Sequence, residues 1–546
     1  MNKIIKYTLS GFAFIIVGLL AGFQIKDSAP GTPMATIDDG LKKLQKTFFF
    51  IEENYVEEPD HDKLVDDAIK GLLEGLDPHS FYIPASEMKQ MQEQMEGSFD
   101  GIGIQFNVVD DTIYVETPIS GGPSEKLGIM SGDRIIKVDG KNVAGIGISN
   151  TEVMKHLKGP KGTEVKVEIL RRGYDDLLEF DIVRDKIPLN SVDEAYMIRE
   201  DIGYLKVTRF AETTYSEFRT QLRKLIDQGM DKLILDLRGN PGGYMNMAYR
   251  MADDFLAANK LIVSTEGRIR QSKQEYRSNS SVGLFEKGSL VVLLDYGSAS
   301  ASEIVSGAIQ DHDRGLIVGV RSFGKGLVQI QEEFEDGSAI RIVISKYYTP
   351  SGRCIQKPYH KSSEDYEKEI SERFESGEIF DQSKIEVPDS LKYTTTSGRT
   401  VYGGGGIYPD IFVADDTTGN SKYFTDLRIK DMFRQFSFDY VDNRPDLIKK
   451  YKTPEEFVEK FPVTQDLIDQ FTAFATDKGV KYNPNGYNRS KKYIDNRIKA
   501  YIGRHLHNDL AFYPVFHQLD NVIQRAVELM PTAHTLEETG KLGMKE

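Results

Sequence analysis

Cysteine is almost absent from this chain of 546 residues, which contains Cys354 alone. A single cysteine cannot form a disulfide within the chain, nor can it build a zinc site of several cysteines. No cysteine stands near the N-terminus, so a lipid-anchored lipoprotein is not expected. The nine histidines are scattered without the spacing of metal ligands. The sequence therefore predicts neither a metal site nor a cofactor.

A net positive charge is also lacking. The formal net charge is −15, and no long basic stripe is present. Binding to nucleic acids depends on Lys and Arg side chains that neutralise phosphates. A nucleic-acid partner is therefore not expected.

Long apolar runs are lacking except at the N-terminus. There Lys3 and Lys6 precede an apolar run from about Tyr7 to Ile25. About 19 residues in a helix span roughly 28 Å, close to the thickness of a bilayer core. The run is interpreted either as a retained anchor with a cytoplasmic N-terminus or as a cleaved signal peptide. Both interpretations predict an exported protein of the cell envelope or periplasm, and the anchor would tether it to the inner membrane.

Changes of composition divide the chain into parts. Strands alternate with helices from about Ile202, which predicts an α/β core. Glycine-rich β segments precede this core, and helical spacing dominates at both ends of the chain. The charged stretch 359–392 is expected to be an exposed insertion. The predicted parts are a signal or membrane anchor (1–26), a helical region (38–96), a β module (97–187), the α/β core (188–414) and a helical C-terminal extension (415–546).

Ser300 lies in a run of small residues, Gly297 to Glu303, directly after an apolar strand. A serine hydroxyl is a weak nucleophile at neutral pH and needs a base to take its proton. Ser300 and Glu303 also fit the capping-box pattern of a helix start, which is an ordinary structural role. The two roles are compatible, because a helix N-terminus favours developing negative charge. The backbone N–H of Ala301 would then face an oxyanion.

Lys325 stands between two glycines in the turn before a later strand. It can act as a general base only where burial or nearby charge lowers its pKa, and Phe323 and Leu327 offer apolar cover. Gln329 lies at an even offset on the strand and would face the same side, where it can orient the amine. The alternative is an ordinary surface lysine. A phosphate-binding loop is disfavoured, because Gly326 replaces the required Ser or Thr and a strand follows instead of a helix.

The run Asp236 to Gly243 places glycines between a strand and a helix. Such glycines let backbone N–H groups approach a reacting carbonyl, although a plain tight turn explains them too. Their spacing does not match a dinucleotide-binding pattern.

Two histidines, His79 and His312, could suggest a Ser-His catalytic pair. We expect His79 to make a local hydrogen bond in a turn and His312 to be solvated at the end of a helix.

Taken together, these segments resemble the carboxy-terminal processing peptidases, the tail-specific serine proteases of family S41. The resemblance covers about residues 41–413 and implies a crotonase-like (ClpP/crotonase) core. It implies Ser300 as nucleophile, Lys325 as general base, Gln329 as its positioning partner, and the N–H groups of Gly243 and Ala301 as the oxyanion hole. The acidic insertion near 364–378 and the helical extension depart from the family pattern. The motifs that carry the resemblance are Gly297–Glu303, Phe323–Gly326 with Gln329, Asp236–Gly243, Asp77–Ser80 and Tyr348–Arg353.

The β module resembles a PDZ domain. In that resemblance Gly101, Ile102, Gly103 and Ile104 form the carboxylate-binding loop. Backbone N–H groups of the loop would capture a free C-terminus while the tail adds to the sheet as a strand. Protein or peptide C-terminal tails are therefore the expected partners. An oligomer or a regulatory partner stays open.

The sequence thus predicts a serine endopeptidase with a Ser-Lys dyad that cleaves exported proteins near their C-terminus. A binding protein without catalysis on the same fold is one alternative, and the joint presence of Ser300, Lys325 and Gln329 disfavours it. A crotonase-type acyl-CoA enzyme is another. The predicted export and the PDZ-like module disfavour that enzyme.

Overall fold

The computed structural model describes residues 34–119, 121–192, 194–279, 283–359 and 363–542. The chain forms two compact units, Met1–Leu72 and Leu73–Glu546. The first unit contains the helix α2 (Met34–Asn54) and most of α3 (His61–Glu74), where helical spacing predicts them. The expected anchor at 1–26 lies outside the described residues. Among the helices of the described ranges, none combines the length and apolar composition needed for a membrane span.

The β module is an antiparallel sheet with its own apolar core. Its elements are β2 (Ser98–Gly101), β3 (Ile104–Val109), β4 (Thr112–Pro118), α5 (Pro123–Lys126), β5 (Arg134–Val138), β6 (Lys141–Asn142), α6 (Asn150–Leu157), β7 (Glu164–Leu170), β8 (Leu178–Val183) and β9 (Asp185–Pro188). The strand order is β3-β4-β5-β7-β8, with β6 beside β5. β2 and β9 pair with each other where the chain enters and leaves the module. β3 is therefore an edge strand of the main sheet.

A six-stranded sheet forms the centre of the α/β core. Its strands, in spatial order, are β10 (Ala195–Met197), β11 (Ile202–Lys206), β12 (Lys232–Asp236), β15 (Ser289–Leu294), β16 (Leu316–Gly319) and β21 (Ile411–Phe412). All neighbouring pairs are parallel except β10 with β11. Every residue of β15 and β16 is buried. Such continuous apolar strands are typical of parallel sheets covered on both faces.

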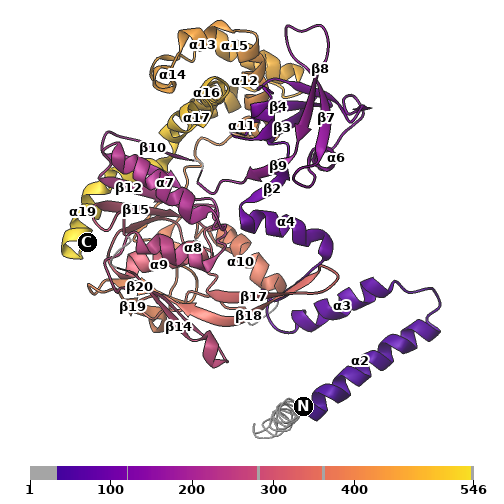
Figure 1. Cartoon of the computed structure of the whole chain (residues 1–546). Coiled ribbons are helices and arrows are strands. Elements are labelled where there is room, and N and C mark those ends of the chain that lie inside the picture. The colour runs from indigo at the N-terminus through magenta and orange to yellow at the C-terminus, as the bar shows by residue number, and fades with distance from the viewer. Residues whose placement is uncertain (1–33, 120, 193, 280–282, 360–362, 543–546) are drawn as a thin grey trace, which may run out of the picture. The chain divides into compact units, whose positions relative to one another are not determined.

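Three helices cover one face of this sheet: α7 (Thr214–Asp227), α8 (Met245–Asp253) and α9 (Ala301–Asp311) (Figure 1). A second sheet has the order β1-β18-β13-β14, with β17 paired to β18. α4 packs on β1 and β18 through Met88. The bounds of these elements are β1 (Phe81–Ile83), α4 (Ala85–Glu96), β13 (Leu261–Glu266), β14 (Gln274–Arg277), β17 (Leu327–Glu333) and β18 (Ala339–Tyr348); two short strands, β19 (Lys392–Thr394) and β20 (Thr400–Tyr402), form a separate hairpin.

The charged stretch 359–392 is not simply an exposed insertion, as the sequence predicts. It contains α10 (Ser363–Ser376), in which Tyr366 is 6% and Arg373 3% exposed. Most described residues of the stretch are exposed, as expected, but some charged side chains of α10 have partners on the α/β core. One such contact is the hydrogen bond from Arg373 to the backbone carbonyl of Ser322.

The C-terminal residues divide into two parts. Helices with their own aromatic core come first: α11 (Lys422–Ile429), α12 (Met432–Asp442), α13 (Asp446–Lys450), α14 (Pro454–Lys460), α15 (Gln465–Asp477), α16 (Pro484–His507) and α17 (Asp509–Phe516). The last two helices, α18 (Asn521–Glu528) and α19 (Met530–Thr539), instead cover the second face of the six-stranded sheet (Figure 1). Arg238, after β12, donates to both carboxylate oxygens of Asp520, which caps α18. The end of the predicted extension therefore belongs to the α/β core.

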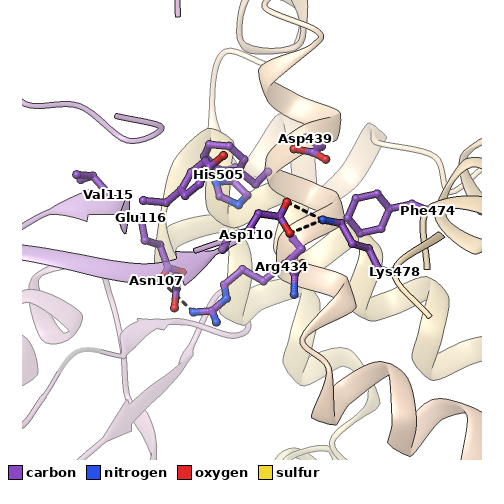
Figure 2. Close-up of a pocket in the computed structure, with 13 residues that line it drawn as sticks. Asn107, Asp110, Val115, Glu116, Arg434, Asp439, Phe474, Lys478 and His505 are labelled. Atoms are coloured by element: carbon purple, nitrogen blue, oxygen red, sulfur yellow. Dashed lines mark hydrogen bonds and ion pairs between the residues drawn. The ribbon is translucent and has the colours of Figure 1, made fainter. Parts of the chain in front are cut away.

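Charged pairs join the β module to the C-terminal helices. Lys478 donates to both carboxylate oxygens of Asp110, and Arg434 reaches Glu116 at 3.2 Å (Figure 2). These residues line a cavity of about 60 Å³ between β3, β4 and the helices α12, α15 and α16. The rings of Tyr114 and Phe438, which line the same cavity, meet edge to face with centroids 5.3 Å apart. The edge-to-face contact adds apolar area to an otherwise ionic contact.

The packing of α19 predicts a stability effect. Leu536 of α19 is 0% exposed against the six-stranded sheet. Leu536→Ala should lower the free energy of unfolding by about 2–5 kcal/mol, because a buried leucine leaves a cavity when truncated. Leu510→Ala is the control, since Leu510 is 62% exposed. Urea denaturation measures both variants, and equal stability of the two would contradict the packing.

Candidate active site

The strand order brings three sequence motifs to one edge of the six-stranded sheet. β12, β15 and β16 are consecutive parallel neighbours. Their carboxyl ends therefore lie side by side, which is where open α/β sheets form their sites. The turn after β12 carries Gly242 and Gly243, the turn after β15 carries Ser300, and the turn after β16 carries Lys325. Topology alone thus gathers residues that are up to 83 positions apart in the sequence.

Hydrogen bonds fasten the first two turns to each other. One carboxylate oxygen of Asp295 accepts the N–H groups of Gly239 at 2.8 Å and Gly297 at 2.9 Å. The carbonyl of Asn240 accepts the N–H of Ala299 at 3.0 Å. The Asp236–Gly243 motif therefore holds the turn that carries Ser300 in place.

The glycines of the Asp236–Gly243 motif are required by close contacts. A Cβ on Gly242 would lie 2.8 Å from the Cβ of Ser300. A Cβ on Gly243, where φ is +143°, would lie 2.2 Å from the carbonyl oxygen of Phe210. Within the described residues, the N–H groups of Gly243 and Ala301 have no hydrogen-bond acceptor in the protein. Gly243 lines a cavity together with Ser300, and Ala301 directly follows Ser300 in the chain.

Ser300 has a strained backbone. Its φ is 56° and its ψ is −111°, a conformation that costs a non-glycine residue about 1–3 kcal/mol. Ser300 directly precedes the first residue of α9, and its backbone N–H donates to the side chain of Glu303. The side chain is half-buried and lines a cavity of about 750 Å³. The hydroxyl is therefore presented to a space large enough for a peptide segment.

Glu303 holds the turns of Ser300 and Lys325 together. Its Oε2 accepts the backbone N–H of Ser300 at 2.7 Å and that of Lys325 at 2.9 Å. Its Oε1 accepts the hydroxyl of Ser322 at 2.5 Å and the N–H of Gly324 at 2.7 Å. Burial raises the pKa of Glu303, and these four donors act against that rise. The sequence suggested Glu303 only as half of a helix cap, and this part of the prediction holds.

Lys325 lies in a water-poor position. Burial lowers the pKa of Lys325 and the cation of Arg341 lowers it further, while the carboxylates of Glu303 and Asp77 act in the opposite direction. Among the described residues, none forms a hydrogen bond or an ion pair with the ammonium group of Lys325. Lys325 and Ser300 are therefore not hydrogen-bonded to each other through that group. Lys325 does not line the cavity that Ser300 lines. Its backbone carbonyl accepts the hydroxyl of Tyr347 at 2.7 Å, and that hydroxyl also lies 3.0 Å from the carbonyl of Ser300.

Gln329 and His79 form a pair that the sequence did not suggest. The amide nitrogen of Gln329 donates to the carbonyl of His79 at 2.5 Å, and no hydrogen bond joins it to Lys325. The ring of His79 is buried and bonds to Tyr366 rather than to its own turn. Burial, with Lys325 nearby, lowers the pKa of His79 to about 4. His312 is not solvated as expected, because its ring nitrogen lies 2.6 Å from the carbonyl of Leu261.

Several residues around the cavity escaped the sequence analysis. The side chains of Met88, Met91 and Met95 line the cavity from α4. Arg341 lines it from β18 and donates to the sulfur of Met91 at 3.2 Å. The methionine spacing of three and four residues is a helical signal that could have revealed this wall.

Across the described part of the chain, no group of three or more His, Cys, Asp or Glu residues is arranged to hold a metal ion.

A groove of about 240 Å³ lies beside the edge strand β3. The predicted carboxylate-binding loop, Gly101 to Ile104, lines it together with Met154 and Leu157 of α6. Gly103 has φ +76°, and a Cβ there would lie 3.0 Å from Ile187. An unpaired strand edge next to a helix can accept an extended peptide.

Comparison with known proteins gives the family. The sequence profile described as peptidase family S41 matches residues 201–366, and a PDZ profile matches 101–182. The carboxy-terminal-processing protease of Bartonella bacilliformis is 40% identical over 321 residues, 58% of this chain and 72% of that protein. The carboxy-terminal processing protease CtpA of Bacillus subtilis is 33% identical over 433 residues, 79% of this chain and 85% of that protein. The chain is a carboxy-terminal processing protease of family S41.

Other regions of this S41 serine peptidase match further profiles. The profile of the N-terminal domain of the activating protease CtpB matches residues 23–87, and a family of unknown function matches 423–508. Among solved structures, the photosystem II D1 C-terminal processing protease is 25% identical, covering 68% of this chain and 92% of that one, with a TM-score of 0.34. The PDZ domain of the carboxy-terminal protease of Vibrio cholerae, in complex with peptide, is 37% identical, covering 17% and 99%, with a TM-score of 0.16.

The contacts of Glu303 predict that Glu303→Gln lowers both stability and activity. Glu303→Gln replaces one acceptor oxygen by an NH₂ donor, which then faces at least one backbone N–H of the two turns. The free energy of unfolding should fall by about 1–3 kcal/mol, the cost of an unpaired buried donor, and peptidase activity should fall with it. Glu332→Gln on β17 is the matched control, because Glu332 is exposed. Unchanged stability and activity in Glu303→Gln would count against this contact.

Proposed function

We propose that this S41 peptidase cleaves peptide bonds near the C-terminus of exported proteins with a Ser-Lys dyad. Ser300 is the nucleophile and Lys325 the general base, with Gln329 helping to position the amine. The N–H groups of Gly243 and Ala301 form the oxyanion hole. The reaction uses neither a metal ion nor a cofactor.

The observation that carries the proposal is the oxygen of Glu303 shared by the backbones of Ser300 and Lys325. Because both backbones bind this oxygen, the Ser300 hydroxyl and the desolvated Lys325 amine belong to neighbouring turns, and this supports their pairing in a dyad. Ser300 and Lys325 make no mutual hydrogen bond in this structure, so the amine has to move toward the hydroxyl before reaction. Catalytic hydrogen bonds in ligand-free enzymes are often longer than in the substrate complex. A water-poor position favours the neutral amine that the base requires.

The reaction consists of acylation followed by hydrolysis. Neutral Lys325 takes the proton of the Ser300 hydroxyl as its oxygen bonds to the scissile carbonyl carbon. The oxyanion accepts hydrogen bonds from the N–H groups of Gly243 and Ala301. When the carbon–nitrogen bond breaks, the Lys325 ammonium gives its proton to the leaving amine. Water then attacks the acyl-enzyme with Lys325 again as base, which releases the new C-terminus and restores the Ser300 hydroxyl.

Tail recognition is the proposed role of the PDZ domain. N–H groups in the loop Gly101-Ile102-Gly103-Ile104 bind the free carboxylate, and the tail pairs with the edge of β3. The groove beside β3 supports this role. The crotonase-like fold of the core, the periplasmic or envelope location and the tether to the inner membrane stay predictions. A protein of that location would meet exported substrates.

The dyad predicts two inactive variants and a loss of activity at low pH, the acid limb of the pH profile. Ser300→Ala and Lys325→Ala should each lower cleavage of a tailed peptide by about 10³-fold or more, as expected for a nucleophile and its base. Lys325 works as the neutral amine, and its pKa is lowered. Activity should therefore be present above that lowered pKa and fall as the pH drops through it. Initial rates across pH measure both effects.

Glu332→Gln is the control for the dyad variants, because Glu332 also lies on β17 but is exposed and does not line the cavity. Its cleavage rate should stay close to that of the wild type. Near-normal cleavage by Ser300→Ala or by Lys325→Ala would remove the mechanism.

The PDZ proposal predicts selectivity for a free C-terminus. Replacing the terminal carboxylate of the peptide by an amide removes a charged acceptor worth about 1.5–3 kcal/mol, so binding should weaken about 10-fold or more. Fluorescence anisotropy with Ser300→Ala protein measures binding without cleavage. Equal affinity for the acid and the amide would contradict tail capture by the loop.

A further inference from the structure

The turn of Lys325 lies between an anion and a cation. On one side, Glu303 accepts its N–H groups. On the other side, Arg373 of α10 donates to the carbonyl of Ser322 at 2.8 Å and to that of Phe323 at 3.2 Å. The guanidinium thus binds two backbone carbonyls of the same segment whose N–H groups donate to Glu303. A planar fork with several donors suits this bridging role.

A buried ionic network fixes Arg373. Glu369 accepts its Nε at 2.6 Å and also pairs with Lys357 at 3.1 Å and Arg321 at 3.3 Å. Arg321, just before the turn, pairs in addition with Glu378 at 2.5 Å. Two acidic residues of the insertion therefore meet cations of the α/β core. Removing one partner from such a buried network leaves an uncompensated charge.

Aromatic contacts also attach α10 to the turn of Lys325. The ammonium of Lys357, which is 2% exposed, lies 4.0 Å from the ring centre of Phe323 and 4.1 Å from that of Tyr366. The rings of Phe323 and Tyr366 have centroids 6.0 Å apart. A desolvated cation between two aromatic rings is a favourable contact. It fixes Phe323, which lies two residues before Lys325.

α10 reaches the other side of the proposed dyad through His79. The hydroxyl of Tyr366 lies 2.9 Å from Nε2 of His79, and their rings pack edge to face with centroids 4.8 Å apart. The carbonyl of the same His79 accepts the amide of Gln329 at 2.5 Å. One helix thus contacts the turn of Lys325 and, through a single intervening residue, Gln329.

We infer that α10 is a positioning element of the catalytic site, in which Arg373 holds the turn of Lys325 and Tyr366 holds, through His79, the acceptor of Gln329. The inference rests on the proposed roles of Lys325 and Gln329. Arg373 and Tyr366 act through other residues and need not touch the substrate. Misplacing a catalytic group by about 1 Å can lower a rate about 10²-fold.

The variant Arg373→Gln tests the first half. Its kcat for a tailed peptide should fall about 10-fold or more while KM stays within about 2-fold, because the tail groove is not altered. The acid limb of kcat should move to higher pH. A loosened turn admits water to the Lys325 amine and weakens the desolvation that lowers its pKa, while Arg341, Glu303, Asp77 and His79 still face the amine.

Two further variants make the test specific. Glu372→Gln is the matched control, because Glu372 precedes Arg373 on α10 and is exposed. Its kcat, KM and pH profile should equal those of the wild type. Tyr366→Phe removes one hydroxyl and keeps the ring. It should lower kcat about 3-fold or more with KM unchanged, and it decides the inference if Arg373→Gln does not fold.

The outcomes separate this inference from the proposed function. Folded Arg373→Gln with wild-type kcat would overturn the inference, and so would a lowered kcat with an unmoved acid limb, which marks a merely structural role. Wild-type kinetics of Tyr366→Phe would do the same for the contact through His79. Activity that is lost in Lys325→Ala but kept in both α10 variants overturns the inference alone. Activity that survives in Lys325→Ala overturns the proposed function itself.

Discussion

The arrangement of the site depends on the buried carboxylate of Glu303. A carboxylate deprived of water is costly unless donors surround it, and here three backbone N–H groups and one hydroxyl do so. These donors come from the turns after β15 and β16. The turns of Ser300 and Lys325 cannot separate without leaving the charge unpaired. A single side chain of α9 therefore keeps the proposed nucleophile beside the turn of the proposed base.

The same carboxylate sets a limit on the chemistry of Lys325. Its charge favours the ammonium form, whereas burial and Arg341 favour the neutral amine, and the second pair of effects is the larger. The neighbouring His79 has a pKa lowered to about 4 and is therefore uncharged at neutral pH. The amine is thus placed between opposing fields that leave it easier to deprotonate than a lysine in water. That balance suits a base that must both take and return a proton.

The sequence shows which turns carry the proposed catalytic residues but not which contacts support those turns, for physical reasons. Ser300, Lys325 and the glycines after β12 are recognisable because small residues and sharp turns leave local patterns, and parallel strand order then brings those turns together. Arg373 and Tyr366 leave no such pattern. Charged residues in a weakly apolar helix look exposed until their partners, Arg321 and Lys357, are known in space. The cover that α19 gives the sheet is equally long-range, since no local periodicity says which face a helix will meet.

A crystal structure of the enzyme acylated or phosphonylated at Ser300 by a peptidyl inhibitor would test the central claim most directly. The account predicts Lys325 Nζ within about 2.7–3.2 Å of Ser300 Oγ, with the inhibitor oxygen bound by the N–H groups of Gly243 and Ala301. It would be contradicted by an adduct in which Lys325 Nζ stays out of reach of Ser300 Oγ and another residue supplies the base.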